Sequence, residues 1–114
     1  MVMQTVAETA YFSRRAEKRL TADELWDAIT MIASNPLCGD LIKETGGLRK
    51  VRFAAGSKGK RGGVRILYYP FSENAPIFLL DVFKKGEKDN LSKAERNALA
   101  MLAGKLRASY RRIK

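Results

Sequence analysis

The chain has 114 residues, a length that suits one compact domain spanning residues 1–114. Lys and Arg number 22 against 12 Asp and Glu, so the formal net charge is +10 and favours a polyanionic partner such as RNA or DNA, an acidic protein or an anionic membrane. Because Cys38 is the only cysteine and histidine is absent, an internal disulfide and a cysteine zinc cluster are excluded, and we expect neither a metal site nor a cofactor.

The sequence also lacks the patterns of a membrane or secreted protein. No apolar run approaches the roughly 20 residues that a membrane-spanning helix needs. The N-terminus carries no basic segment followed by an apolar one, so no secretory signal is predicted. We therefore expect a cytoplasmic protein without membrane contact.

The N-terminal residues predict a strand followed by a helix. Met1–Val6 is short and apolar, which favours a strand. Thr9 is a suitable N-cap for a helix over Ala10–Leu20. Three apolar residues four positions apart would form the buried side of this helix: Phe12, Ala16 and Leu20.

A second helix is predicted to begin at a capping box. Thr21 and Glu24 have the Thr-x-x-Glu spacing in which each side chain bonds the other residue's backbone. Asn35 precedes Pro36 and therefore ends the helix, because the residue before proline avoids the α region. Trp26 is expected in the core or against another helix. The predicted buried side consists of Leu25, Ile29, Ile32 and Ala33.

Three strands and a last helix are predicted in the remaining sequence. Leu48–Phe53 alternates in polarity, Val64–Tyr69 is rich in β-branched and aromatic residues, and Ile77–Phe83 is almost wholly apolar. Loops of this length predict an antiparallel meander. Ser92 and Glu95 form a second capping box, which opens a helix with an apolar stripe of Leu99, Leu102, Leu106, Tyr110 and Ile113. The fold class is therefore α+β, with the order β-α-α-β-β-β-α and the helices packed on one small sheet.

The charge pattern within this meander is the strongest functional signal. No acidic side chain occurs between Thr45 and Ser72, whereas seven Lys or Arg do. Lys50 and Arg52 project from one face of their predicted strand, and Arg65 joins that face if the strand register allows. Further cations follow in the glycine-rich loop and after the third strand: Lys58, Lys60, Arg61, Lys84 and Lys85.

Such a basic groove suits a phosphodiester, and three uses are open. It can bind nucleic acid passively, cleave RNA, or dock an acidic peptide. Cleavage without histidine would require a lysine whose pKa is lowered by neighbouring cations, with Lys50 as candidate base and Arg65 as a permanent charge stabiliser. Among the nearby acids, Asp81 could buttress a cation, while Glu87 and Asp89 could face solvent or orient Lys85.

Three separated blocks resemble the RelE/HigB family of bacterial toxins from type II toxin–antitoxin systems. They are Glu44–Lys50 (ETGGLRK), Gly59–Arg65 (GKRGGVR) and Phe83–Ser92 (FKKGEKDNLS). The resemblance implies a RelE-like microbial RNase fold. It also implies a ribosome-dependent endonuclease that cuts mRNA in the ribosomal A site through attack of the 2′-hydroxyl, and so inhibits translation.

The resemblance also implies roles for individual residues. The family's catalytic cations match Lys50, Arg52 and Arg65, and its basic residue after the last strand matches Lys84 or, better, Lys85. Other cations would hold the phosphates of mRNA or ribosomal RNA, namely Arg49, Lys58, Lys60, Arg61 and Lys84. Where some members have a tyrosine, this chain has Leu91 or its neighbours, so the role of that tyrosine is vacant or supplied by another residue.

A cognate antitoxin is implied as partner, commonly a helix-turn-helix protein of the HigA type. It would neutralise the toxin by covering the groove or by blocking entry into the ribosome. Two alternatives remain beside the nuclease. One is a toxin of the same fold that resembles the ParE relatives, which poison DNA gyrase, and the other is a nucleic-acid or ribosome-binding module without enzymatic activity.

Overall fold

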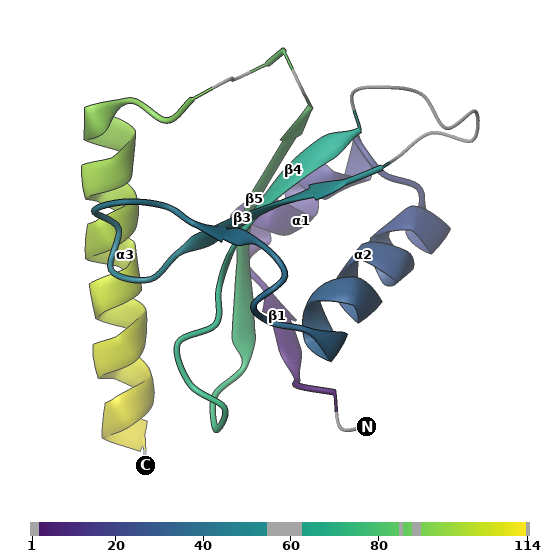
Figure 1. The fold of residues 1–114 in the computed structure, drawn as a ribbon. Coiled ribbons are helices and arrows are strands. Elements are labelled where there is room, and N and C mark those ends of the chain that lie inside the picture. Colours follow the sequence, from purple (N-terminus) through teal and green to yellow (C-terminus); the bar gives the residue numbers. More distant parts are fainter. Residues whose placement is uncertain (1–2, 55–62, 85, 88–89, 114) are drawn as a thin grey trace.

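The computed structural model describes residues 3–54, 63–84, 86–87 and 90–113, and side chains as far as residue 110. The fold is α+β, as predicted (Figure 1). None of the described helices is long and apolar enough to cross a bilayer. The elements in chain order are β1 (Val6–Glu8), α1 (Ala10–Glu17), α2 (Ala22–Ser34), β2 (Asp40–Leu41), β3 (Arg49–Phe53), β4 (Val64–Tyr69), β5 (Ile77–Lys84) and α3 (Lys93–Ile113).

The strands form one sheet in the order β1-β5-β4-β3-β2. The predicted meander is confirmed, because β3, β4 and β5 pair antiparallel in sequence order. The first strand begins later than predicted, since β1 runs parallel to β5 with Val6 opposite Ile77. Gln4 instead donates its side-chain amide to the carbonyls of Ser72 and Ala75. Pairing with a distant strand thus sets this element, and the two-residue β2 at the other edge was not predicted.

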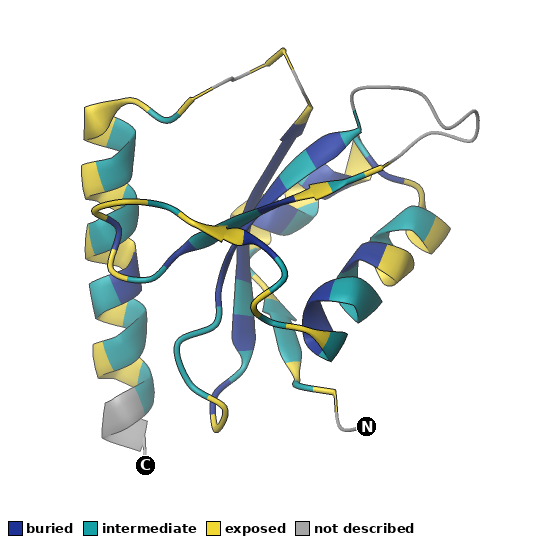
Figure 2. Cartoon of the chain, viewed as in Figure 1, coloured by how far each residue is buried: buried dark blue, intermediate teal, exposed yellow. Residues whose placement is uncertain are grey.

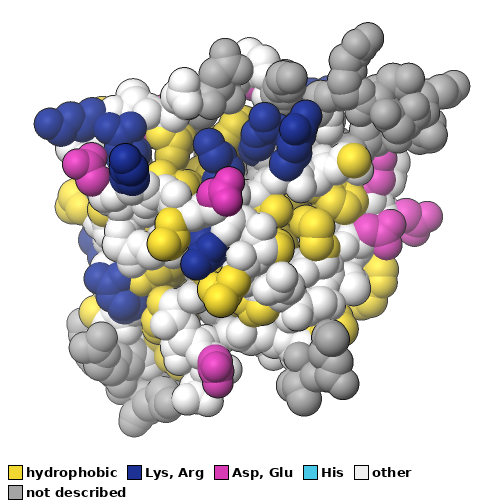
Figure 3. Space-filling model, viewed as in Figure 1, with side chains coloured by type: hydrophobic (Ala, Val, Ile, Leu, Met, Phe, Trp, Pro, Cys, Tyr) yellow, Lys and Arg dark blue, Asp and Glu magenta, His cyan; other side chains and the backbone are white. Residues whose placement is uncertain are grey.

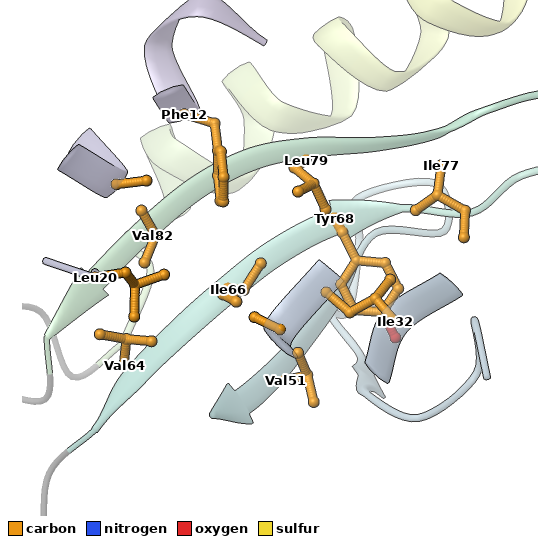
Figure 4. Close-up of a cluster of buried hydrophobic side chains, with 12 residues drawn as sticks. Phe12, Leu20, Ile32, Val51, Val64, Ile66, Tyr68, Ile77, Leu79 and Val82 are labelled. Carbon is orange, nitrogen blue, oxygen red and sulfur yellow. The ribbon is translucent and has the colours of Figure 1, made fainter. Parts of the chain in front are cut away.

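The first two helices cover one face of the sheet, and their caps follow the predictions. Thr9 accepts a hydrogen bond from the Phe12 amide and donates one to the Leu79 carbonyl, which ties the start of α1 to β5. Both bonds of the capping box are present between Thr21 and Glu24. The core beneath these helices is shown in Figure 4 and includes Phe12, Ala16, Leu20, Ala28, Ile32, Val51, Val64, Ile66, Tyr68, Ile77, Leu79 and Val82.

Trp26 is not part of this core, so that prediction was wrong. Its side chain is 69% exposed. The small residue Ala28, together with Ile32 and Ala33, fills the contact between α2 and the sheet. An α-helix turns by 100° per residue, so position 26 points away from position 28 and toward solvent.

The last helix covers the opposite face of the sheet, and Figure 2 shows buried residues along the central strands between the layers. Ser92 and Glu95 form the predicted capping box. Leu102, predicted on the buried stripe, is 37% exposed, because the helix turns Ala103 onto the sheet instead. This second core contains Leu48, Leu67, Tyr69, Leu80, Phe83 and Ala103, with Leu99 and Leu106 packed against it.

Candidate functional site

Three predicted catalytic cations lie on the sheet face that α3 covers. Leu48, just before β3, is buried under α3. Lys50 and Arg52 lie two and four positions after it and therefore face the same side of the sheet. On β4, Arg65 alternates with residues of the other core and so faces the same way. Arg52 and Arg65 are direct cross-strand partners. The register that the sequence left open therefore brings Arg65 to Lys50 and Arg52, and we call these three residues the cationic surface.

The guanidinium of Arg65 has an unusual environment. Its Nη1 atom is buried, and no described residue accepts a hydrogen bond from it. A buried donor without an acceptor costs roughly 1–3 kcal/mol, more for a charged group. An anionic oxygen is the acceptor that such a guanidinium bonds most strongly. The atom is thus suited to a phosphate oxygen.

Of the carboxylates around these cations, Asp40 is the cross-strand neighbour of Lys50 without a described ion pair to it, and Asp81 and Glu87 are engaged elsewhere. Asp81 accepts a 2.6 Å hydrogen bond from Arg15 of α1, on the other side of the sheet. Glu87 pairs with Arg19, which follows α1. Within the described residues, no ion pair involves Lys50, Arg52 or Arg65. Like charges directly opposite one another destabilise a sheet, so this arrangement favours a bound polyanion.

The surface view agrees with this distribution. In Figure 3, Lys and Arg side chains gather over the sheet beside α3. Lys50 and Arg65 are half-buried, whereas Arg52 is exposed. A ligand on this face would therefore meet Arg52 at the surface and the other two cations more deeply.

The start of β3 is held by the turn that precedes it. Thr45 is fully buried and its hydroxyl donates to the Ile42 carbonyl while accepting from the Leu48 amide. Gly47 has a φ of 117°, and a Cβ there would approach the Tyr69 ring to 3.3 Å. The conformation therefore requires glycine, and the Thr-Gly-Gly motif acts by placing β3.

Arg107 of α3 secures the same turn from the other side. Its Nη1 atom donates to the Gly46 carbonyl and to the Tyr69 hydroxyl, and its guanidinium lies 5.9 Å from the centre of the Tyr69 ring. The helix dipole alone would account for a basic residue near this helix end. No local pattern could have paired Arg107 with a turn 61 positions earlier.

Comparison with known proteins agrees with this architecture. A family model described as the RelE toxin of the RelE/RelB toxin–antitoxin system matches residues 4–112. The chain belongs to the RelE toxin family. Its fold is also similar to the structure of Escherichia coli toxin RelE, solved in the free state as a double arginine-to-alanine mutant. The TM-score is 0.57 and the sequence identity is 14%, and the match covers 89% of this chain and 96% of the RelE chain. At this identity the similarity supports the fold alone.

Two further predicted site residues of this RelE-family chain, Arg49 and Lys84, are not on the cationic surface. Arg49 lies on the opposite face of β3, where Nη1 donates to the Gly39 carbonyl at 2.5 Å and to the Leu37 carbonyl at 3.5 Å. Lys84 is exposed and lies two positions after Val82, which belongs to the core under α1 and α2, so Lys84 faces that side of the sheet. The remaining predicted cations lie outside the described residues: Lys58, Lys60, Arg61 and Lys85.

A hollow on the molecule lies away from the cationic surface. It is bordered by the N-terminal segment, the end of α2, the β4–β5 connection and Tyr110 of α3. This hollow adjoins the Pro70 end of β4, whereas Arg65 lies near the strand's other end. Its lining offers Glu73 as the one ionisable carboxylate, so it does not contribute to a phosphate site.

Proposed function

We propose that this RelE-family toxin is a ribosome-dependent endonuclease that cuts translated mRNA in the ribosomal A site and so inhibits translation. The observation that carries the proposal is that Lys50, Arg52 and Arg65 share one face of the sheet and form no ion pair within the described residues. Membership of the RelE toxin family supports the same reaction class. The RNA is the polyanion that offsets the repulsion between these cations.

The reaction requires three duties that these side chains can perform. A base takes the proton of the 2′-hydroxyl, and the 2′-oxygen then attacks phosphorus to form a 2′,3′-cyclic phosphate. The bond to the 5′-oxygen breaks, and the leaving oxygen takes a proton either from the lysine that was protonated in the first step or from water. Since the chain has no histidine, the base falls to a lysine of the cluster, with Lys50 as candidate. Arg65 would stabilise the negative charge that grows on the phosphoryl oxygens.

The remaining predicted cations extend this role. We propose Lys85 as a further catalytic cation, and Arg49, Lys58, Lys60, Arg61 and Lys84 as contacts to the phosphates of mRNA or ribosomal RNA. Because Arg49 already binds loop carbonyls, its contribution would be smaller than that of a free surface cation. Phosphate contacts of this kind weaken as salt rises.

A translation assay with a reporter mRNA tests the proposal. The wild-type protein should cut the message only while ribosomes translate it, and Arg65→Ala should lower the cutting rate by about a hundredfold or more. Leu80→Ala serves as a folding control, because loss of its buried side chain should cost roughly 2–5 kcal/mol without removing a charge from the cationic surface.

Intact mRNA with the wild-type protein would contradict the proposal. RNA binding without cleavage would favour a passive ribosome-binding module, and supercoiling defects with normal translation would favour a gyrase poison. We also propose a cognate antitoxin of the helix-turn-helix, HigA-like type. Its coexpression from the neighbouring reading frame should restore growth.

A further inference from the structure

A tight turn follows β5, and Glu87 closes it through two hydrogen bonds to the backbone of Lys84. The amide of Glu87 donates to the Lys84 carbonyl at 3.0 Å. The Glu87 carboxylate in turn accepts from the Lys84 amide at 2.5 Å through Oε1. Gly86 has a φ of 98°, which a residue with a Cβ would adopt only under strain. Glu87 therefore fixes both backbone groups of Lys84.

Arg19 anchors this turn to the first helix. Its Nε atom donates to Glu87 Oε1 at 3.0 Å, and its Nη2 atom donates to Oε2 at 2.5 Å. The third nitrogen, Nη1, donates to the Arg15 carbonyl in α1 at 3.0 Å. All three guanidinium nitrogens are thus used, and the Arg19 side chain is only 12% exposed. A bidentate pair of this kind sets a direction as well as a distance.

The anchored strand end borders the cationic surface. Phe83 is the cross-strand partner of Arg65, and Lys84 is the partner of Val64. In sequence, Lys84 is followed directly by the predicted catalytic Lys85. Any shift of the Lys84 backbone would therefore displace the strand beside Arg65, although Arg19 itself lies on the other side of the sheet.

We propose that Arg19 and Glu87 form a positioning pair that holds the end of β5 beside Arg65 for RNA cleavage. This inference rests on the proposed function, since it assigns the pair a part in that reaction. Neither residue belongs to the predicted site. The pair acts through the backbone of Lys84 and does not touch the substrate.

Because the Arg19–Glu87 pair is partly exposed, its effect on the cleavage rate can be distinguished from its effect on stability. The Glu87 side chain is 38% exposed. Ion pairs that reach solvent typically contribute only a fraction of a kcal/mol to stability. A small misplacement of reacting groups can nevertheless lower a rate by tenfold or more. Loss of this pair should therefore reduce cleavage far more than it reduces stability.

Two single variants and their combination test the proposal. Arg19→Ala removes the anchor, and Glu87→Gln removes the charge while its amide oxygen still accepts from Lys84. Each should lower the single-turnover cleavage rate on translating ribosomes by about tenfold, with ribosome binding changed less than about twofold. The double variant should cleave no more slowly than the slower single variant, because both substitutions remove the same interaction.

Matched controls keep the result specific. Arg14→Ala removes the same charge from an exposed position of α1 and should keep wild-type cleavage. Arg19→Lys keeps the charge but not the bidentate fork, so it should restore only part of the rate. Amide hydrogen exchange gives an independent readout, since the Lys84 amide should exchange at least about tenfold faster in Arg19→Ala, with the amides of β3 unchanged.

The outcomes separate the two proposals. Wild-type rates and unchanged Lys84 exchange in both variants would overturn the positioning pair and leave the nuclease intact. Additive losses in the double variant would also overturn it. A wild-type protein that leaves translated mRNA uncut would overturn both proposals together.

Discussion

The arginines on the two faces of the sheet differ in whether they pair with a carboxylate. On the face covered by α1 and α2, Arg15 binds Asp81 and Arg19 binds Glu87. On the face covered by α3, Arg52 and Arg65 stand opposite each other, and within the described residues neither has a carboxylate partner. The arginines of α1 and its C-terminal end thus hold elements together, whereas the strand arginines on the other face are available for a ligand. Breaking the buried Arg15–Asp81 pair on the first face should cost stability, and removing a strand cation on the second face should cost function.

Among the charged residues, the largest expected effect on stability is at Asp81. Its carboxylate is buried and bonds both Arg15 and the Val82 amide. Asp81→Ala should lower the free energy of unfolding by about 3 kcal/mol, because it leaves a partly buried guanidinium without its partner. Urea denaturation measures this change. A loss below about 1 kcal/mol would mean that the paired face does not depend on its ion pairs.

Arg52→Ala should have a smaller and opposite effect on stability. Removing one of two facing cations should raise the free energy of unfolding by roughly 0.2–1 kcal/mol. The same variant should weaken ribosome or RNA binding and reduce the slope of log affinity against log salt by about one. Binding measured at several salt concentrations checks this. An unchanged salt slope would remove Arg52 from the phosphate contacts.

The smallest effect concerns pH and Glu87. Hydrogen bonds from the Arg19 side chain and then from the Lys84 amide lower the pKa of this carboxyl from its ordinary value of 4.5 to about 2. A lowered pKa means that the contribution to stability is present above pH 4.5 and is lost as the pH falls toward 2. The difference in urea midpoint between wild type and Glu87→Gln should therefore shrink across this range. A difference that stays constant with pH would contradict the ion pair.

Local signals made much of the fold predictable. All three helices begin where a capping residue predicted, at Thr9, Thr21 and Ser92, because a cap bonds a backbone amide only a few positions away. The bounds of β4 match its prediction of Val64–Tyr69. Alternation also placed Lys50 and Arg52 on one face of β3.

Long-range features were not predictable. A register irregularity between β4 and β5 lies at Leu67 and Tyr68. Across it, Leu80 belongs to the core under α3 and Val82 to the core under α1 and α2, although residues two positions apart share a face in a regular strand. This irregularity shifts the alternation of side chains by one residue. It decides on which face of the sheet Lys84 lies, and no sequence pattern reveals it. Arg19 and Arg107 likewise find partners more than 60 positions away.

The most direct measurement is single-turnover cleavage of mRNA on translating ribosomes by wild type and Arg65→Ala, both confirmed as folded. We expect the wild type to cut the message and Arg65→Ala to be slower by about a hundredfold or more, with an unfolding free energy equal to or above that of wild type. Equal cutting rates for the two proteins would contradict the claim that this unpaired arginine meets the scissile phosphate.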